Sequence, residues 1–152
     1  MIQSRKPTVA HLVGSYLSST ATFVHQILSA MRRYRPLVLA PFTEDPERFP
    51  FPEIYTPGLA PVQVMLLKIA RGLCHRQQMV EPFYLQVVQD QTVRILHAHF
   101  GTIGVFSLPV RASSDLPLVT TFYGFDMSKL GRSRRWVRDY ERLFREGAHI
   151  FK

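Results

Sequence analysis

Short, unbroken apolar runs alternate along this chain with segments of helical periodicity. The runs that we expect to form strands span 8–13, 36–40, 53–56, 93–98 and 116–121. Four of them lack the polar alternation of a half-exposed strand, which is typical of strands buried on both faces of a parallel sheet. The expected helices span 22–34, 61–76, 82–89, 105–112 and 133–146. The alternation predicts an α/β fold with βαβ units and a mostly parallel sheet.

Composition narrows the class of protein. With 152 residues, 46% of them hydrophobic and 20% charged, the chain has the size and core of one ordinary globular domain. The single Cys74 excludes an internal disulfide and a cysteine-rich zinc site. Since no apolar run reaches the roughly 18 residues of a membrane-spanning helix, and the N-terminus does not resemble a secretory signal, we expect a cytoplasmic location.

The net charge of +8 favours a polyanionic partner. Nucleic acid, an anionic membrane and phosphorylated small molecules all fit that charge. We do not expect nucleic acid, because the sequence has no recognisable nucleic-acid-binding motif. The arginines of 132–145, together with Arg32, Arg33 and Arg35, make an anionic membrane surface a further expected partner.

Polar, glycine-rich turns follow three of the predicted strands. They span 14–20, 99–104 and 122–128. In open parallel sheets, ligands bind at the carboxyl ends of the strands. We therefore expect these turns to converge on one edge of the sheet and to form the binding site.

Several residues in these turns have two interpretations. Gly14 and Ser15 could cradle a phosphate with their backbone N–H groups, or form an ordinary strand–helix turn. No dinucleotide-binding glycine fingerprint is present. Asp126 could bind a sugar hydroxyl, or cap a turn through its own backbone.

His97 and His99 near the end of a predicted strand are a further pair of candidates. We expect them to face opposite sides, one buried and hydrogen-bonded and the other, His99, facing the cleft. A His-x-His at a strand end also begins some metal-hydrolase sites, but an ion needs further ligands. Because the other histidines show no spacing that supplies them, we expect no metal.

Two segments resemble the N-terminal domain of glycosyltransferase family 4, a group of GT-B enzymes that use nucleotide sugars. They are HAHFGTIG at 97–104 and PLVTTFYGFDMS at 117–128. LFREGAHI at 143–150 is similar to the family's next segment, and 22–27 to its first helix. The resemblance covers the chain loosely and residues 95–150 closely.

This resemblance implies that residues 1–152 form a Rossmann-like, three-layer N-terminal domain, on the acceptor side of a GT-B architecture. The C-terminal nucleotide-sugar domain, with the family's catalytic glutamates, is then absent from this chain, and the fragment is expected to be inactive. A strand expected to begin at 148 and to stop at Lys152 also indicates a fragment.

The implied activity is that of a retaining hexosyltransferase-type enzyme of polysaccharide biosynthesis. It would transfer a sugar from a nucleotide-sugar donor to a glycan or lipid-linked acceptor, without a metal or other cofactor, at the inner membrane face. The alternative is a stand-alone Rossmann-like module that binds an anionic ligand without catalysis.

The substrate-binding residues that we expect lie in the three turns, whereas no catalytic residue is assigned. They are Gly14, Ser15, His99, Gly101, Tyr123, Gly124 and Asp126. Where the family commonly has a histidine that contacts the donor sugar, this chain has Tyr123. A phenol is a hydrogen-bond donor at neutral pH rather than a ready base.

Overall fold

The fold is built on a five-stranded sheet in the order β3-β2-β1-β4-β5. The computed structural model describes residues 6–15, 22–44, 46–69 and 80–147. The strands are β1 (Thr8–Leu12), β2 (Arg35–Leu39), β3 (Ile54–Tyr55), β4 (Val93–His99) and β5 (Leu118–Thr121). All four strand pairs are parallel, so the predicted α/β class with a parallel sheet is confirmed. The chain runs outward from β1 to β3, then returns to the other side of β1, which makes the β1–β4 boundary a topological switch point.

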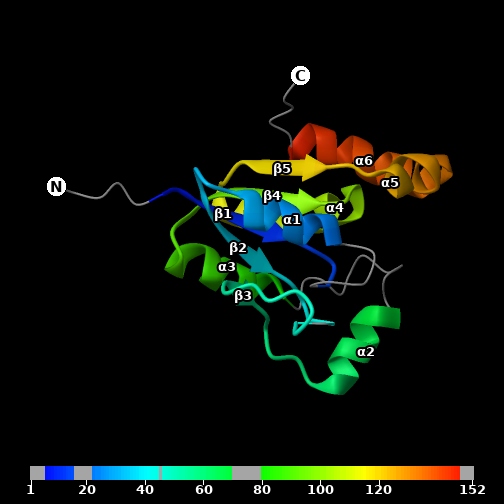
Figure 1. The fold of residues 1–152 in the computed structure, drawn as a ribbon. Helices are drawn as coiled ribbons and strands as arrows, with labels where there is room; N and C mark the ends of the chain where they lie inside the picture. The colour runs from blue at the N-terminus through cyan, green and yellow to red at the C-terminus, as the bar shows by residue number, and fades with distance from the viewer. Residues whose placement is uncertain (1–5, 16–21, 45, 70–79, 148–152) are drawn as a thin grey trace.

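Helices cover both faces of this sheet, as in a Rossmann-like three-layer domain (Figure 1). They are α1 (Thr22–Ala30), α2 (Pro61–Ile69), α3 (Glu81–Asp90), α4 (Gly101–Ser114), α5 (Gly124–Ser128), the 3-10 helix η3 (Leu130–Arg132) and α6 (Arg134–Glu146). The larger core joins α3, α4 and α6 to one face of the sheet. A smaller core joins α1 to the other face through Val24 and Leu28.

Strand alternation decides which residues of β1 belong to which core. Ala10 and Leu12 pack in the larger core, whereas Val13 packs in the core under α1. Because side chains alternate between the faces of a strand, His11 points to the α1 face, where the candidate site lies.

Two predicted boundaries were wrong at glycines. Within the predicted turn 99–104, α4 already begins at Gly101, and the predicted turn 122–128 contains the short helix α5. Phe100 explains the abrupt start of α4, because its φ of 81° turns the chain out of β4 within one residue. Gly101 is needed there, since a Cβ would collide with the rings of Phe122 and Tyr140.

Two predicted helices differ from the structure in other ways. The helix expected over 22–34 ends at Ala30, and the chain enters β2 at Arg35, which Pro36 holds in an extended conformation. The start of α2 is not packed into a core, because the side chains of Val62 and Met65 are 58% and 53% exposed. The predicted turn residues 16–20, the end of the 61–76 helix and the strand at 148–151 lie outside the described residues.

The close approach of α4 to β5 gives a test of the fold. A Cβ on Gly104 would lie 2.6 Å from Thr120 Oγ1 and 2.8 Å from Leu143 Cδ2. Gly104→Ala should therefore lower the free energy of unfolding by about 1–3 kcal/mol, the usual range for overpacking. Thermal unfolding should show this as a loss of roughly 2–4 °C for each kcal/mol.

Gly124→Ala is the matched control, because a Cβ there meets no described atom within 4 Å. That variant should melt at or slightly above the wild-type temperature, since alanine is the better helix former. Equal melting temperatures for the two variants would contradict the described packing of α4 on β5.

Candidate binding site

The three predicted turns meet at one edge of the sheet in the part of the chain that the structure describes. β1, β4 and β5 are neighbouring parallel strands, so Gly14, Gly101 and Gly124 all follow strand ends at the same edge. Gly14 lies beside α4, where a Cβ would come within 3.3 Å of Ile103 Cδ1. Ser15 is buried next to it. The predicted convergence is confirmed for these residues.

Three histidines lie together beneath this edge, on the α1 face of the sheet. His11 of β1 is the register partner of His97 of β4. The ring centroids lie 5.0 Å apart for His11 and His97, 4.4 Å apart for His97 and His99, and 5.2 Å apart for His11 and His99. The expectation that His97 and His99 face opposite sides was wrong, because residues two apart in a strand share a face.

Hydrogen bonds join two of these histidines to Tyr123 in a chain. His11 Nδ1 lies 2.9 Å from His99 Nε2, and His99 Nδ1 lies 2.9 Å from the Tyr123 hydroxyl. His97 makes a separate bond of 2.8 Å from Nε2 to Thr121 Oγ1. His11 and His99 are fully buried, so His99 does not face the cleft as expected and reaches the sheet edge only through Tyr123.

Burial keeps the imidazoles neutral. Loss of solvation, with a smaller contribution from neighbouring histidines, lowers the pKa of His11 to about 2 and the pKa of His99 to about 3. Burial also lowers the pKa of His97. At neutral pH each ring of the cluster therefore carries one proton, with one nitrogen as donor and the other as acceptor.

Tyr123 closes the cluster at the sheet edge. Its ring packs against Phe23 of α1, with a centroid separation of 4.6 Å, and against Phe100, with a separation of 4.7 Å. Burial and the neighbouring Asp126 carboxylate both raise the pKa of Tyr123. The phenol thus keeps its proton at neutral pH, as expected of a tyrosine at this position.

Asp126 caps the N-terminus of α5. Of the two predicted roles, binding a sugar hydroxyl or capping a turn, its contacts are those of a cap. It is fully buried, and its Oδ2 accepts the backbone N–H of Tyr123 at 2.9 Å. Its Oδ1 accepts a longer hydrogen bond of 3.4 Å from the hydroxyl of Tyr140 in α6. Asp126 therefore fixes the backbone of Tyr123 and links it to α6.

The three histidines are also a set that could hold a metal ion, since one ligand atom of each lies within 4.8 Å of the others. Their present geometry is that of hydrogen-bonded rings. His97 and His99 are stacked with an interplanar angle of 29°, whereas a metal ion must lie in the plane of each ligating ring. In addition, His11 and His99 direct nitrogens at one another rather than at a common point. At least one ring would have to turn before the set could bind zinc.

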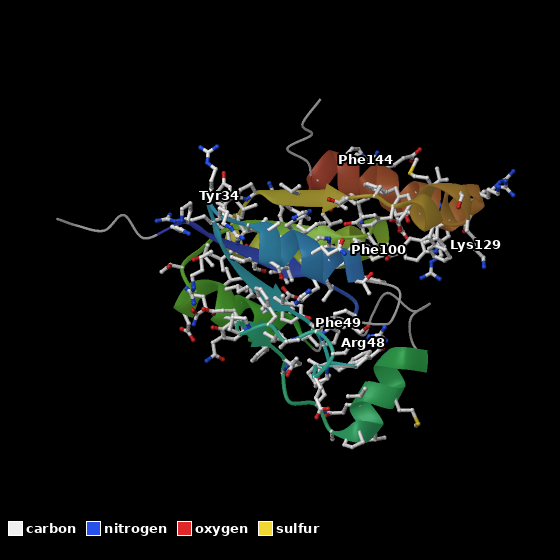
Figure 2. All side chains as sticks on the ribbon, in the orientation of Figure 1. Tyr34, Arg48, Phe49, Phe100, Lys129 and Phe144 are labelled. Carbon is white, nitrogen blue, oxygen red and sulfur yellow. The ribbon has the colours of Figure 1, made fainter. Side chains whose placement is uncertain are left out.

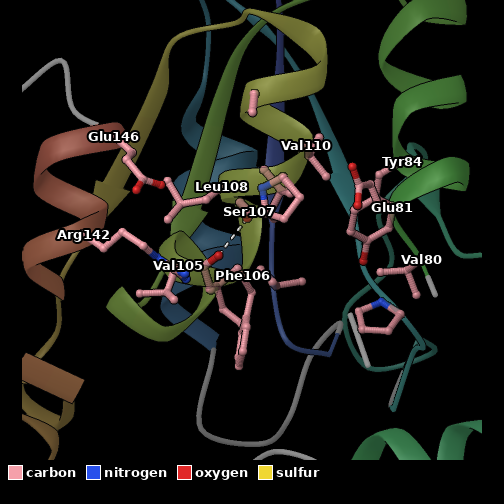
Figure 3. A pocket seen from close by; sticks show the side chains of 16 residues that line it. Val80, Glu81, Tyr84, Val105, Phe106, Ser107, Leu108, Val110, Arg142 and Glu146 are labelled. Carbon is pink, nitrogen blue, oxygen red and sulfur yellow. Dashed lines mark hydrogen bonds between the residues drawn. The ribbon is translucent and has the colours of Figure 1, made fainter. Parts of the chain in front are cut away.

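A separate hollow lies on the opposite side of the sheet, over α4 (Figure 3). Arg142 and Glu146 border it on one side, and Glu81 and Tyr84 on the other. The described residues that line it include none of the predicted site residues. The hollow also reaches Leu12 and Val13 at the carboxyl end of β1, so it adjoins the predicted binding edge from the α4 side. The polar cluster on the other face contains two of the predicted residues themselves, His99 and Tyr123.

Comparison with known proteins gave no family for this chain: neither a family model nor a curated protein matches it. Among the described helices, none is long and apolar enough to cross a membrane.

The buried neutral histidines should make stability depend on pH. In the unfolded chain a histidine titrates near its reference pKa of about 6.5, so at acid pH the unfolded state binds more protons than the folded state. The free energy of unfolding should be highest well above pH 6.5 and should fall as the pH drops to 5, by up to roughly 1.4 kcal/mol per pH unit for each buried histidine. Urea unfolding at several pH values between 5 and 7.5 measures this slope.

His11→Leu is the companion variant, because it removes one buried imidazole and leaves an apolar side chain on the same face. Its stability should fall less steeply between pH 7.5 and 5 than that of the wild type. An identical slope in both proteins would show that His11 is protonated in the folded state.

Proposed function

We propose that this chain is the acceptor-side domain of a retaining glycosyltransferase that uses a nucleotide sugar. The observation that carries the proposal is the place of Tyr123. It stands at the carboxyl edge of the sheet, where glycosyltransferase family 4 commonly has a sugar-contacting histidine, and His99 and Asp126 hold it from two sides. The order of the resembling segments and the Rossmann-like fold are consistent with this proposal.

In this proposal the binding edge contributes contacts rather than catalytic groups. The Tyr123 hydroxyl donates a hydrogen bond to the sugar, and Gly124 leaves room for the ligand, since a Cβ there would meet no described atom within 4 Å. Gly14, Ser15 and Gly101 line the neighbouring strand ends. A second domain supplies most donor contacts and the catalytic carboxylates, and the transfer needs no metal.

The test is an assay of sugar transfer by the complete two-domain enzyme with a panel of radiolabelled nucleotide sugars and a glycan or lipid-linked acceptor. Transfer with retained anomeric configuration, absent for residues 1–152 alone, supports the proposal. Transfer by residues 1–152 alone would contradict the two-domain arrangement. Binding of an anionic ligand without transfer in any context would favour the stand-alone module instead.

Tyr123→Phe should weaken catalysis without unfolding the protein. The change removes one neutral hydrogen bond, worth about 0.5–1.5 kcal/mol. The kcat/KM of the complete enzyme should therefore fall by up to about tenfold. Steady-state kinetics measure the loss, and thermal unfolding shows whether the fold is kept.

Tyr34→Phe is the matched control for this variant. It removes the same hydroxyl from an exposed tyrosine at the opposite end of the sheet, just before β2 (Figure 2). Its kinetics should equal those of the wild type. If Tyr123→Phe keeps normal kinetics but melts much earlier, Tyr123 has a structural role and the site assignment is wrong.

Peripheral contact with an anionic membrane surface is also part of the proposal. Phe125 and Met127 of α5 are 53% and 64% exposed, and the Lys129 ammonium lies 5.7 Å from the centroid of the Phe125 ring. The exposed Arg132 and Arg134 follow directly. Apolar side chains ringed by cations are typical of surfaces that enter the headgroup region of anionic lipids.

Not every expected basic residue belongs to this surface. Arg35 is paired with Glu53 at 2.8 Å and also donates to Gln91, so it links β2 to the segments beside it. We therefore place the membrane contact at α5 and the start of α6, not at the start of β2.

Sedimentation with phosphatidylglycerol-containing vesicles tests this placement. The double variant Phe125→Ser, Met127→Ser should bind at least about tenfold more weakly, because burial of each large apolar side chain contributes about 1.5–3 kcal/mol. The control Val62→Ser, Met65→Ser removes equally exposed apolar side chains from α2 and should bind like the wild type. Loss of binding in the α2 variant alone would contradict the α5 surface.

A further inference from the structure

The hydrogen-bonded chain from His11 to Tyr123 has an unsatisfied end inside the protein. His11 Nε2 is buried and has no partner among the described residues. The other end is the hydroxyl of Tyr123, which is only partly buried and lies at the binding edge. Since both histidines are neutral, the protons of the chain can be arranged in two directions.

In the inward arrangement, Tyr123 donates its proton to His99 Nδ1, and His99 Nε2–H donates to His11 Nδ1. His11 then carries its proton on Nε2, where the buried N–H has no acceptor in the described part of the chain. In the outward arrangement, His11 Nδ1–H donates to His99 Nε2, and His99 Nδ1–H donates to the Tyr123 oxygen. The buried end is then a free lone pair on His11 Nε2.

The outward arrangement is the better one for the buried end. A buried N–H without an acceptor is rarer in proteins than an acceptor with an unused lone pair. This arrangement also moves the one uncommitted proton to the O–H of Tyr123, at the partly exposed end, where water or a ligand can accept it.

We propose that His11 and His99 are positioning residues that fix Tyr123 as a hydrogen-bond donor toward a ligand oxygen. The proton of the phenol is directed away from His99 because the lone pair facing that ring is already occupied. His97 is not part of this chain, since its Nε2 bonds to Thr121.

This arrangement selects the chemistry of the ligand atom at Tyr123. The site accepts an oxygen with a free lone pair, as in a sugar hydroxyl or a phosphate. It rejects an ammonium group, which has protons only and would leave the phenol O–H without an acceptor. The identity of that oxygen as part of a donor sugar rests on the proposed function, whereas the direction of the hydrogen bonds from His11 to Tyr123 does not.

Nitrogen-15 NMR of histidine-labelled residues 1–152 tests the direction, because the two imidazole nitrogens report which of them carries the proton. We expect both His11 and His99 as the Nδ1–H tautomer at neutral pH. Nε2–H on both rings would mean the inward arrangement and would overturn the proposal. This outcome is independent of any sugar transfer, so it can fail while the proposed function stands.

Two substitutions of His11 separate positioning from packing. His11→Asn keeps an N–H donor near the place of Nδ1, whereas His11→Leu fills similar space without one. His99 should remain the Nδ1–H tautomer in His11→Asn and should lose that preference in His11→Leu. A preference for Nδ1–H kept equally in both variants would show that His11 does not set the direction of the hydrogen bonds through His99.

Kinetics of the complete enzyme supply the functional readout. His11→Leu should lower kcat/KM by up to about tenfold, the loss expected for Tyr123→Phe, since both changes disable the same hydrogen bond. His11→Asn should restore most of the activity. In the Tyr123→Phe background, His11→Leu should have no further effect, and an additive loss would contradict action through Tyr123.

Discussion

The parallel pairing of β1 with β4 is the contact on which the rest of the structure depends. It joins strands that are far apart in the sequence and stands at the centre of the sheet, between the two directions in which the chain extends. It brings the turns after β1, β4 and β5 to one edge. Its register also places His11 opposite His97, and a slip by one residue would move every β1 side chain to the other face.

Much of the fold could be predicted because parallel strands leave a strong local pattern. Four of the five strands come from short, largely apolar runs, and all five strands overlap the ranges predicted for them. The helix starts at Gly101 and Gly124 could not be found in the same way. Glycine is common in turns, and only the positive φ of Phe100 and the rings of Phe122 and Tyr140 show why a helix begins at Gly101.

The site was predicted less completely, because its decisive contacts are between distant residues. Tyr123 and Asp126 were identified as polar residues after a strand, and the local cap by Asp126 was one of its two predicted interpretations, but its contact with Tyr140 in another helix could not be predicted. His11 was missed, since within its own strand it looks like part of a buried apolar run. The period of a strand would have put His97 and His99 on one face, and their parallel alignment with β1 would then have pointed to His11.

The cluster is hard to explain by stability alone. Three imidazoles occupy the sheet face whose apolar side chains, such as Val38, pack against Val24 and Leu28 of α1. Burial lowers the pKa of each ring, so each makes the folded state less favourable in acid, and His11 Nε2 has no hydrogen-bond partner among the described residues. Valine or leucine would fill the same space without either penalty. Departures from the best-packed choice concentrate at functional sites. Here the polar cluster is hydrogen-bonded through His99 to the Tyr123 hydroxyl, which lies at the edge where ligands bind in parallel sheets.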